Sequence, residues 1–452
     1  MKYLQTSFFL FVLLVLISCS KDSEVESDSS IQEEVISAED QILIDAITAE
    51  AYPLSKNPFQ ISDSELSFLN EIGDSRIIGL GESTHGTKEF FQIKHRVFQY
   101  LVENHGFSAF VFEMDMAEAR IFNDWVQHRR DGSIRDLMID NMYFWTWRTL
   151  EVKDLLEWMR NYNVGKALED MIGFYGVDTQ AERYNKDALL QIIYKLDREL
   201  GDAINSRTVD YGNLQSLYNE NLTDSLVAKV RAEIEYVKQQ VKVLLPEIEA
   251  ELGKSEALWA ERLVRNMEQV ELVLYEGARH SRYYLRDLFM AENTSWFFDL
   301  LGHDAKMVLW AHNAHLANNS VYGGPWGGSQ GNYLRSTYGD QYQIIGFSFA
   351  KGSFTAVQTT PRQLRTNAIT TEPIDGSLNW YFSKSSINQF AIKTVSENQA
   401  LNSWMNSRQR FLNIGAIFNG NPEDYYFEYP VQIHYDYLIH LDRTTNSDLL
   451  FN

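Results

Sequence analysis

The sequence predicts an α/β fold with three layers, α/β/α, a mainly parallel central sheet and a large helical insertion. Three observations support this prediction. Short apolar runs recur along the chain, and each ends in polar residues or glycine. Helical patterns separate the early runs, and a long block at about residues 181–301 carries helical patterns without a convincing strand. Short apolar runs are typical of parallel strands buried on both faces, and their alternation with helices indicates a layered sheet with right-handed crossovers.

The first 18 residues have the features of a signal peptide. Lys2 supplies a positive charge, and residues 8–17 form an apolar run that is too short to span a membrane. The run ends at Leu16-Ile17-Ser18-Cys19, which resembles the lipobox of bacterial lipoproteins, and Cys19 is the sole cysteine. We therefore expect cleavage before Cys19 and attachment of a lipid to it.

Residues 19–37 are polar, acidic and serine-rich, which is typical of a solvated tether. Residues 38–452 then form the folded α/β domain. Acidic residues directly after a lipid-bearing cysteine resemble export signals of surface lipoproteins, although a plain spacer has the same composition. We expect a protein of the bacterial cell envelope, held by its lipid anchor and facing either the periplasm or the cell surface.

A net charge of −22 argues against nucleic acid or an anionic membrane surface as a partner, because both require a basic face. The expected partner is a small molecule.

The elements follow in chain order. Helices are predicted at residues 38–52 and 61–71. The predicted strands are residues 76–80, 109–113, 171–177, 307–311, 343–349, 414–418 and 437–441. Helices at 89–104, 117–129 and 151–161 separate the early strands.

The predicted insertion contains two amphipathic stretches, residues 226–245 and 255–277, with apolar side chains three and four positions apart. A coiled coil is not expected, because Pro246 and Gly253 should interrupt the helices. A Gly-rich loop at 322–328 does not match a phosphate-binding loop. It is expected to be the rim of a pocket, with a plain surface loop as the alternative.

The turn Gly81-Glu82-Ser83-Thr84-His85-Gly86 places a carboxylate and an imidazole three residues apart, after a predicted strand and before a helix. Such a pair suits acid/base chemistry. The alternative is an ordinary loop in which Ser83 or Thr84 caps the helix.

Other predicted strands also end in chemically active side chains. The second ends at Glu113 and Asp115, the third is followed by Asp178 and Gln180, and the fourth by His312 and His315. Ligands of open α/β sheets bind at the carboxyl ends of the strands, so these residues should converge with Glu82 and His85.

No Gly-X-Ser-X-Gly motif follows a strand, so water is the expected nucleophile. Two mechanisms fit. In the first, His85 takes a proton from water and Glu82 or Glu113 orients its ring. In the second, Glu82, His85, Glu113, His312 and His315 bind a divalent metal that activates the water. The first is preferred, without a cofactor.

These motifs resemble the erythromycin esterase family. The resemblance rests on the Gly81–Gly86 turn, Lys94, Glu113, Arg286-Asp287, Met290-Ala291-Glu292-Asn293 and Trp310-Ala311-His312-Asn313-Ala314-His315, in the expected order. It implies an α/β core with a helical insertion and hydrolysis of the lactone ester of macrolide antibiotics, hence macrolide resistance.

The resemblance also implies site residues. His85 matches the proposed general base, supported by Glu82, Glu113, His312 and His315, and Arg286 is expected to stabilise the oxyanion. Some macrolide-hydrolysing members carry arginine where this chain has Lys94, and lysine lacks the bidentate fork.

A broader superfamily shares the Gly-Glu-X-X-His turn. It includes metal-dependent peptidases and a haem-binding lipoprotein. A metal-dependent hydrolase and a non-catalytic haem- or ligand-binding surface lipoprotein are therefore the alternatives.

Overall fold

The computed structural model describes residues 36–450, except 220–222, 281, 283 and 322–326. The predicted signal peptide, Cys19 and nearly all of the predicted tether lie outside the described residues. Most of the Gly-rich loop lies outside them as well.

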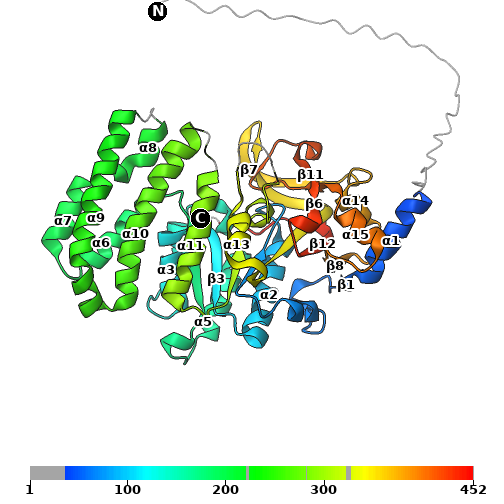
Figure 1. Cartoon of the computed structure of the whole chain (residues 1–452), viewed down its shortest axis with the longest axis horizontal. Helices are drawn as coiled ribbons and strands as arrows, with labels where there is room; N and C mark the ends of the chain where they lie inside the picture. Colours follow the sequence, from blue (N-terminus) through cyan, green and yellow to red (C-terminus); the bar gives the residue numbers. More distant parts are fainter. Residues whose placement is uncertain (1–35, 220–222, 281, 283, 322–326, 451–452) are drawn as a thin grey trace, which may run out of the picture.

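A ten-stranded sheet forms the centre of the fold, in the order β1-β8-β12-β6-β2-β5-β3-β4, with β7 and β10 paired to β6 (Figure 1). Strands β2 to β6 and β12 are joined by parallel pairs, whereas β1, β7 and β8 pair antiparallel. The strands are β1 (Tyr52–Pro53), β2 (Ile77–Leu80), β3 (Ala109–Asp115), β4 (Gly173–Asp178), β5 (Met307–Trp310), β6 (Tyr342–Thr359), β7 (Arg362–Ile369), β8 (Gln389–Lys393), β10 (Ile417–Phe418) and β12 (Tyr437–Thr444). A separate pair joins β9 (Arg408–Leu412) and β11 (Tyr426–Pro430).

Each face of the sheet carries its own hydrophobic core, because successive strand residues point to opposite faces. Ile78 and Val308 join the core under one set of helices, and Ile77 and Leu309 join the other. The first set is α2 (Lys88–His105), α4 (Ile134–Asn141) and α5 (Leu150–Tyr162), with α3 (Met116–Val126) reaching both cores. The second set is α1 (Ala38–Glu50), α11 (Tyr284–Leu301), α13 (Gln330–Tyr338), α14 (Leu378–Ser383) and α15 (Gln399–Met405). The predicted three-layer α/β fold is confirmed.

The described part of the chain between β4 and β5 consists of helices joined by turns and contains no strand, which confirms the predicted helical insertion. It contains α6 (Glu182–Ile193), α7 (Arg198–Arg207), α8 (Leu214–Asn219), α9 (Asp224–Leu252), α10 (Lys254–Leu272), a π-helical segment (Val273–Arg279) and α11. In Figure 1, α6 to α10 lie at the left end of the molecule, and α1 and α15 lie at the right end. Helices α9 and α10 are antiparallel, since Arg231 bonds to Glu271 and Lys238 to Glu268.

Pro246 does not interrupt a helix, contrary to expectation. Helix α9 continues through it to Leu252. An internal proline costs about 3 kcal/mol. The flanking Leu244 and Ile248 are buried in the core of the insertion, and this packing offsets the cost. Gly253, with a positive φ of 92°, does end the helix, as predicted.

Three further predictions need correction. The helix predicted at 61–71 is only a 3-10 segment, Ser67–Glu71, because Glu65 accepts backbone bonds from Ser55 and Ser62 and holds that part in turns. The strand predicted at 414–418 is reduced to β10, since Ile414 and Gly415 donate to the Ser83 carbonyl instead. The strand predicted at 343–349 is longer, continuing as β6 into a hairpin with β7. Among the described helices, none is both long enough and apolar enough to cross a membrane.

Candidate active site

The turn from Gly81 to Gly86 follows β2 at the sheet edge where β2, β3, β4 and β5 end together. Both glycines are required by close contacts. A Cβ atom at Gly81 would lie 2.1 Å from Asn313 Oδ1, and one at Gly86 would lie 2.1 Å from the Thr355 carbonyl oxygen. The turn is therefore held against both β6 and the short helix α12 (Asn313–Leu316).

Glu82 and His85 form a hydrogen-bonded pair within this turn. His85 Nδ1 lies 2.6 Å from Glu82 Oε1. Glu82 is fully buried, and the His85 side chain is 13% exposed. An ionised carboxylate only accepts hydrogen bonds, so Nδ1 carries the hydrogen and Nε2 is left able to accept a proton. Of the two carboxylates predicted to orient this ring, Glu82 makes the contact and Glu113 does not.

The other Glu82 oxygen, Oε2, accepts from two further donors. Lys94 Nζ on α2 lies 2.5 Å away, and Trp310 Nε1 at the end of β5 lies 2.7 Å away. Burial favours the neutral carboxyl, but the charge of Lys94 and the bond from His85 outweigh it, so the pKa of Glu82 lies below its ordinary value. Burial lowers the pKa of Lys94 to about 8. At pH 7 both members of this buried pair are charged.

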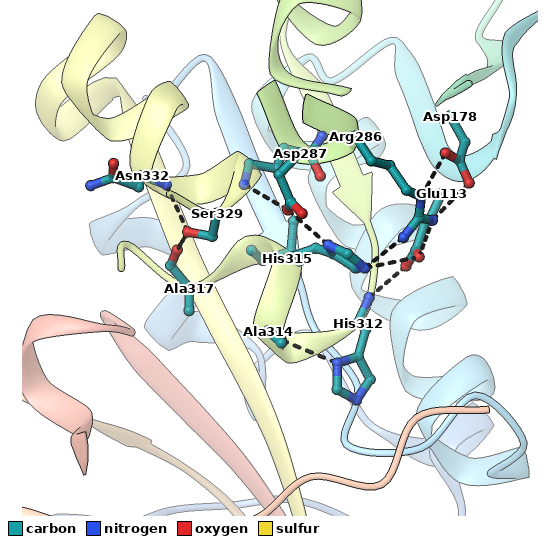
Figure 2. A network of polar contacts seen from close by, with 12 residues as sticks. Glu113, Asp178, Arg286, Asp287, His312, Ala314, His315, Ala317, Ser329 and Asn332 are labelled. Atoms are coloured by element: carbon teal, nitrogen blue, oxygen red, sulfur yellow. Dashed lines mark hydrogen bonds and ion pairs between the residues drawn. The ribbon is translucent and has the colours of Figure 1, made fainter. Parts of the chain in front are cut away.

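A second charged cluster lies at the same sheet edge (Figure 2). Arg286 Nε and Nη2 donate to the two oxygens of Asp178 at 2.9 and 2.7 Å, and Nη2 also donates to Glu113 Oε1 at 2.7 Å. Arg286 thus joins the ends of β3 and β4 from α11. Burial alone would raise the pKa of Glu113, but the charges of His315 and Arg286 hold it well below its ordinary value.

His315 lies between two carboxylates. Its Nδ1 is 2.7 Å from Asp287 Oδ1, and its Nε2 is 3.3 Å from Glu113 Oε1. Burial would lower the pKa of His315, but the charges of Asp287 and Glu113 raise it to about 10. The two carboxylates therefore favour the protonated ring, whereas Arg286 Nη1, 2.9 Å from Nε2, can only donate and favours a ring with its hydrogen on Nδ1 alone.

His312 is neutral. Its Nδ1 accepts the Ala314 N–H at 3.2 Å, so its hydrogen is on Nε2. Burial, together with the neighbouring histidines, lowers the pKa of His312 to about 3. Nε2 is buried and has no hydrogen-bond partner in the described part of the chain.

The rings of His312 and His85 border a common space. Their centroids are 5.2 Å apart. A Cβ atom at Gly415 would lie 3.7 Å from His312 Nε2 and 3.8 Å from His85 Cδ2. Glycine at this position, with a φ of 74°, therefore keeps side-chain atoms out of the gap between the two rings.

All seven side chains predicted from the sequence reach this region of the sheet edge: Glu82, His85, Lys94, Glu113, Arg286, His312 and His315. They form two groups, one of Glu82, His85, Lys94 and His312 and the other of Glu113, Arg286 and His315. The His312 backbone N–H connects the groups by donating to Glu113 Oε2 at 2.9 Å. For Arg286, Asp178 and Glu113 engage Nε and Nη2, and His315 Nε2 contacts Nη1, so all three nitrogens make contacts within this cluster.

Three further residues of these groups were given no role from the sequence, although Asp178 was expected at this edge of the sheet. Asp178 holds Arg286, Asp287 holds His315, and Trp310 donates to Glu82. Each carried a usable signal, because Asp178 and Trp310 are the last residues of β4 and β5 and Asp287 follows Arg286. Which partner each side chain would find depends on the packing of α11 over the sheet.

A pocket of about 750 Å³ opens beside Arg286, Asp287 and His315. The helical insertion supplies Val273 and Leu274, and β11 supplies Phe427. Gly328 and Ser329, at the described end of the Gly-rich loop, also line it. The rest of the predicted rim, residues 322–326, lies outside the described residues. The volume suits a small-molecule ligand.

The carboxylates of the predicted metal alternative are engaged by other side chains. In the described ranges, no group of three or more His, Cys, Asp or Glu side chains is arranged to hold a metal ion. Glu82 accepts from Lys94 and Trp310, His312 Nδ1 accepts from the backbone, and Glu113 contacts Arg286. Two buried cations, Lys94 and Arg286, thus lie beside the two carboxylates predicted for the metal alternative.

Comparison with known families matches residues 102–444 to the family described as erythromycin esterase. The chain belongs to the erythromycin esterase family. The resemblance inferred from the sequence motifs is confirmed, and the family places this chain among hydrolases. Glu113, Arg286, His312 and His315 lie inside the matched span, whereas Glu82, His85 and Lys94 precede it.

Individual relatives agree with this assignment. Erythromycin esterase type II of Escherichia coli is 26% identical over 311 residues, which are 63% of this chain and 72% of the relative. A solved structure of a mutant erythromycin esterase in its open conformation has a TM-score of 0.64 at 16% identity, over 88% of this chain and 98% of that one. A structure titled as a succinoglycan biosynthesis protein has a TM-score of 0.78 at 23% identity, over 92% of this chain and all of the other. At these identities the two structures show the shared fold alone.

Proposed function

We propose that this protein hydrolyses a carboxylic ester or lactone, with His85 as the general base that activates water. The observation that carries the proposal is the Glu82–His85 pair. The hydrogen on Nδ1 points to a buried carboxylate at 2.6 Å, so Nε2 is the basic nitrogen, on a side chain that retains some exposure. A base held in one tautomer by a buried carboxylate is the arrangement that proton transfer requires.

In the proposed reaction, His85 Nε2 takes a proton from water as the water oxygen bonds to the carbonyl carbon. The carbonyl π electrons move onto oxygen, and the neutral His312 Nε2–H is placed to donate to that oxyanion. When the intermediate collapses, the carbonyl re-forms and the bond to the leaving oxygen breaks. The leaving alkoxide takes the proton from His85. Glu82 stays ionised and stabilises the imidazolium.

The substrate is proposed to be a small-molecule ester or lactone, macrolides included. The 750 Å³ pocket has apolar walls from Val273, Leu274 and Phe427, and polar groups at Arg286, Asp287 and His315. Such a pocket suits a largely apolar ligand that carries a few polar groups. The acidic chain also disfavours nucleic acid.

A mass-spectrometric screen of lactones and esters tests the proposal, with wild type, His85→Ala and His303→Ala compared side by side. His303 is an exposed histidine outside the site and serves as the matched control. We expect hydrolysis products from wild type and His303→Ala only. A lactone should give one ring-opened product that is heavier by one water, and an ester should give two products whose masses sum to the substrate plus one water. Hydrolysis by His85→Ala at the wild-type rate, with an unchanged circular dichroism spectrum, would exclude His85 as the base.

We also propose that the mature chain is anchored to the cell envelope by a lipid on Cys19. The lipobox-like sequence and the polar stretch that follows it support this location.

A further inference from the structure

Trp310 touches the Glu82–His85–Lys94 group but lies outside the proposed chemistry. We infer that Trp310 is a positioning residue whose indole N–H fixes the Glu82 carboxylate so that one oxygen faces His85. The inference rests on the proposed role of His85 as base and adds a residue to which no role in the reaction has been given.

Two donors converge on one carboxylate oxygen. Trp310 Nε1 lies 2.7 Å from Glu82 Oε2, and Lys94 Nζ lies 2.5 Å from the same atom. Oε1 is thereby left for His85 Nδ1, at 2.6 Å. An ammonium group is a compact donor that can follow a rotating carboxylate, whereas an indole has a single N–H in a fixed direction. The indole is therefore the donor that sets the rotation of the carboxylate.

The indole itself cannot turn. Trp310 is 1% exposed, and its ring packs against Phe112 and Phe91 with centroids 4.5 and 4.7 Å away. Its backbone is equally fixed, because Trp310 pairs with Leu80, two residues before Glu82. The tryptophan and the carboxylate are thus held by adjacent strands, and the N–H direction is set by the sheet.

The ring also contacts the second donor. Lys94 Nζ lies 4.1 Å from the Trp310 ring centroid, within the range of a cation–π interaction. Trp310 therefore stabilises the buried ammonium and the buried carboxylate at once, through different parts of the same side chain. Phenylalanine at this position would keep an aromatic ring but lose the N–H, which separates the two effects.

We expect Trp310→Phe to lower kcat about 10- to 100-fold and to leave KM within about twofold, because Trp310 does not line the 750 Å³ pocket. The acid limb of the kcat/KM profile should move to lower pH, since a carboxylate that is free to turn away from Nδ1 stabilises the imidazolium less. The His85 ring ¹⁵N spectrum, which needs no substrate, should change from a single Nδ1–H tautomer to a mixture.

Trp125→Phe is the matched control. Trp125 is also buried, donates its N–H to the Gly132 carbonyl at 3.0 Å and lies 4.5 Å from the Arg160 guanidinium, far from Glu82 in the fold. It should change none of the three measurements. If Trp310→Phe folds and also changes none of them, Trp310 is purely structural and the inference is wrong.

If Trp310→Phe does not fold, β-(3-benzothienyl)alanine at position 310 keeps the ring shape and removes only the donor. The same three results are expected, and wild-type values would overturn the inference. If no ester is cleaved by the wild type, the proposed function fails. The tautomer measurement still decides whether Trp310 controls the Glu82–His85 pair.

Discussion

The His312 backbone N–H donates to one oxygen of Glu113 at 2.9 Å, while Arg286 donates to the other at 2.7 Å. Glu113 therefore fixes the strand end that carries His312 and, through the same carboxylate, the charged cluster around His315. This contact joins the group around Glu82 and His85 to the group around Arg286 and His315, so that the two form one site. Glu113 thereby helps to place His312 beside His85, although Glu113 itself makes no hydrogen bond to His85.

Glu82→Gln should lower kcat about 100-fold or more. The amide can donate as well as accept, so His85 is no longer held with its hydrogen on Nδ1. Hydrolysis of the substrate found by the screen measures this, and Glu39→Gln, an exposed change in α1, is the control. A loss smaller than threefold in a folded variant would contradict the assigned role of Glu82.

Arg286→Met should lower the free energy of unfolding by about 3–5 kcal/mol, because it leaves Asp178 and Glu113 buried without their counter-charge. Urea denaturation measures the change. Arg443→Met provides a comparison, since Arg443 is mostly exposed and its nearest carboxylate contact is 3.7 Å long. That variant should stay within about 0.5 kcal/mol of wild type. Equal stability of the two variants would show that the Arg286 cluster adds nothing to the fold.

Asp115→Asn should flatten the dependence of stability on pH. Burial raises the pKa of Asp115 to about 8 from its ordinary 3.8. Between these values the folded chain keeps a proton that the unfolded chain releases. The free energy of unfolding therefore falls as pH rises from about 4 to 8, by up to about 1.4 kcal/mol per unit. Asparagine cannot ionise, yet its Oδ1 can still accept from Ala117 N–H.

Urea midpoints between pH 5 and pH 8.5 test this, with the exposed Asp140→Asn as control. Some slope should remain in Asp115→Asn, because burial and the Asp115 charge also raise the pKa of Glu118. An unchanged slope would mean that Asp115 is ionised in the folded protein.

EDTA should leave hydrolysis intact. The carboxylates that a metal would need already bond to Lys94 and Arg286. Rates before and after dialysis against the chelator provide the measurement. Loss of activity that a divalent ion restores would favour the metal-dependent alternative.

Cys19→Ser should release the protein from the membrane fraction. Serine cannot form the thioether that holds the lipid. Fractionation followed by immunoblotting detects the change. Continued membrane association of the variant would count against lipidation.

Sequence patterns predicted the site well where one short segment supplies both partners. Glu82 and His85 share a turn of six residues, and the hydrogen bond between them is a local property. The convergence of Glu113, His312 and His315 was also predictable, because parallel strands present their carboxyl ends on one edge of the sheet.

Other features depended on contacts that the sequence does not display. Helix α9 passes through Pro246 because packing against α10 outweighs a local penalty. The strand at 414–418 is short because the Ser83 carbonyl takes the Ile414 N–H, a contact between segments more than 300 residues apart. Arg286 was predicted to stabilise an oxyanion. Its ion pair with Asp178 depends on how α11 packs over the sheet, which the sequence does not display.

The ion pair between Asp178 and Arg286 joins residues 108 positions apart, and the intervening chain is the helical insertion. Closing so long a loop has an entropic cost that only the folded insertion can offset, which is expected to slow assembly. Strand β5 follows the insertion and pairs with β2 and β3, so the sheet edge and the active site close across the same long segment. During refolding, recovery of activity should lag behind recovery of secondary structure, with docking of the insertion as the last step.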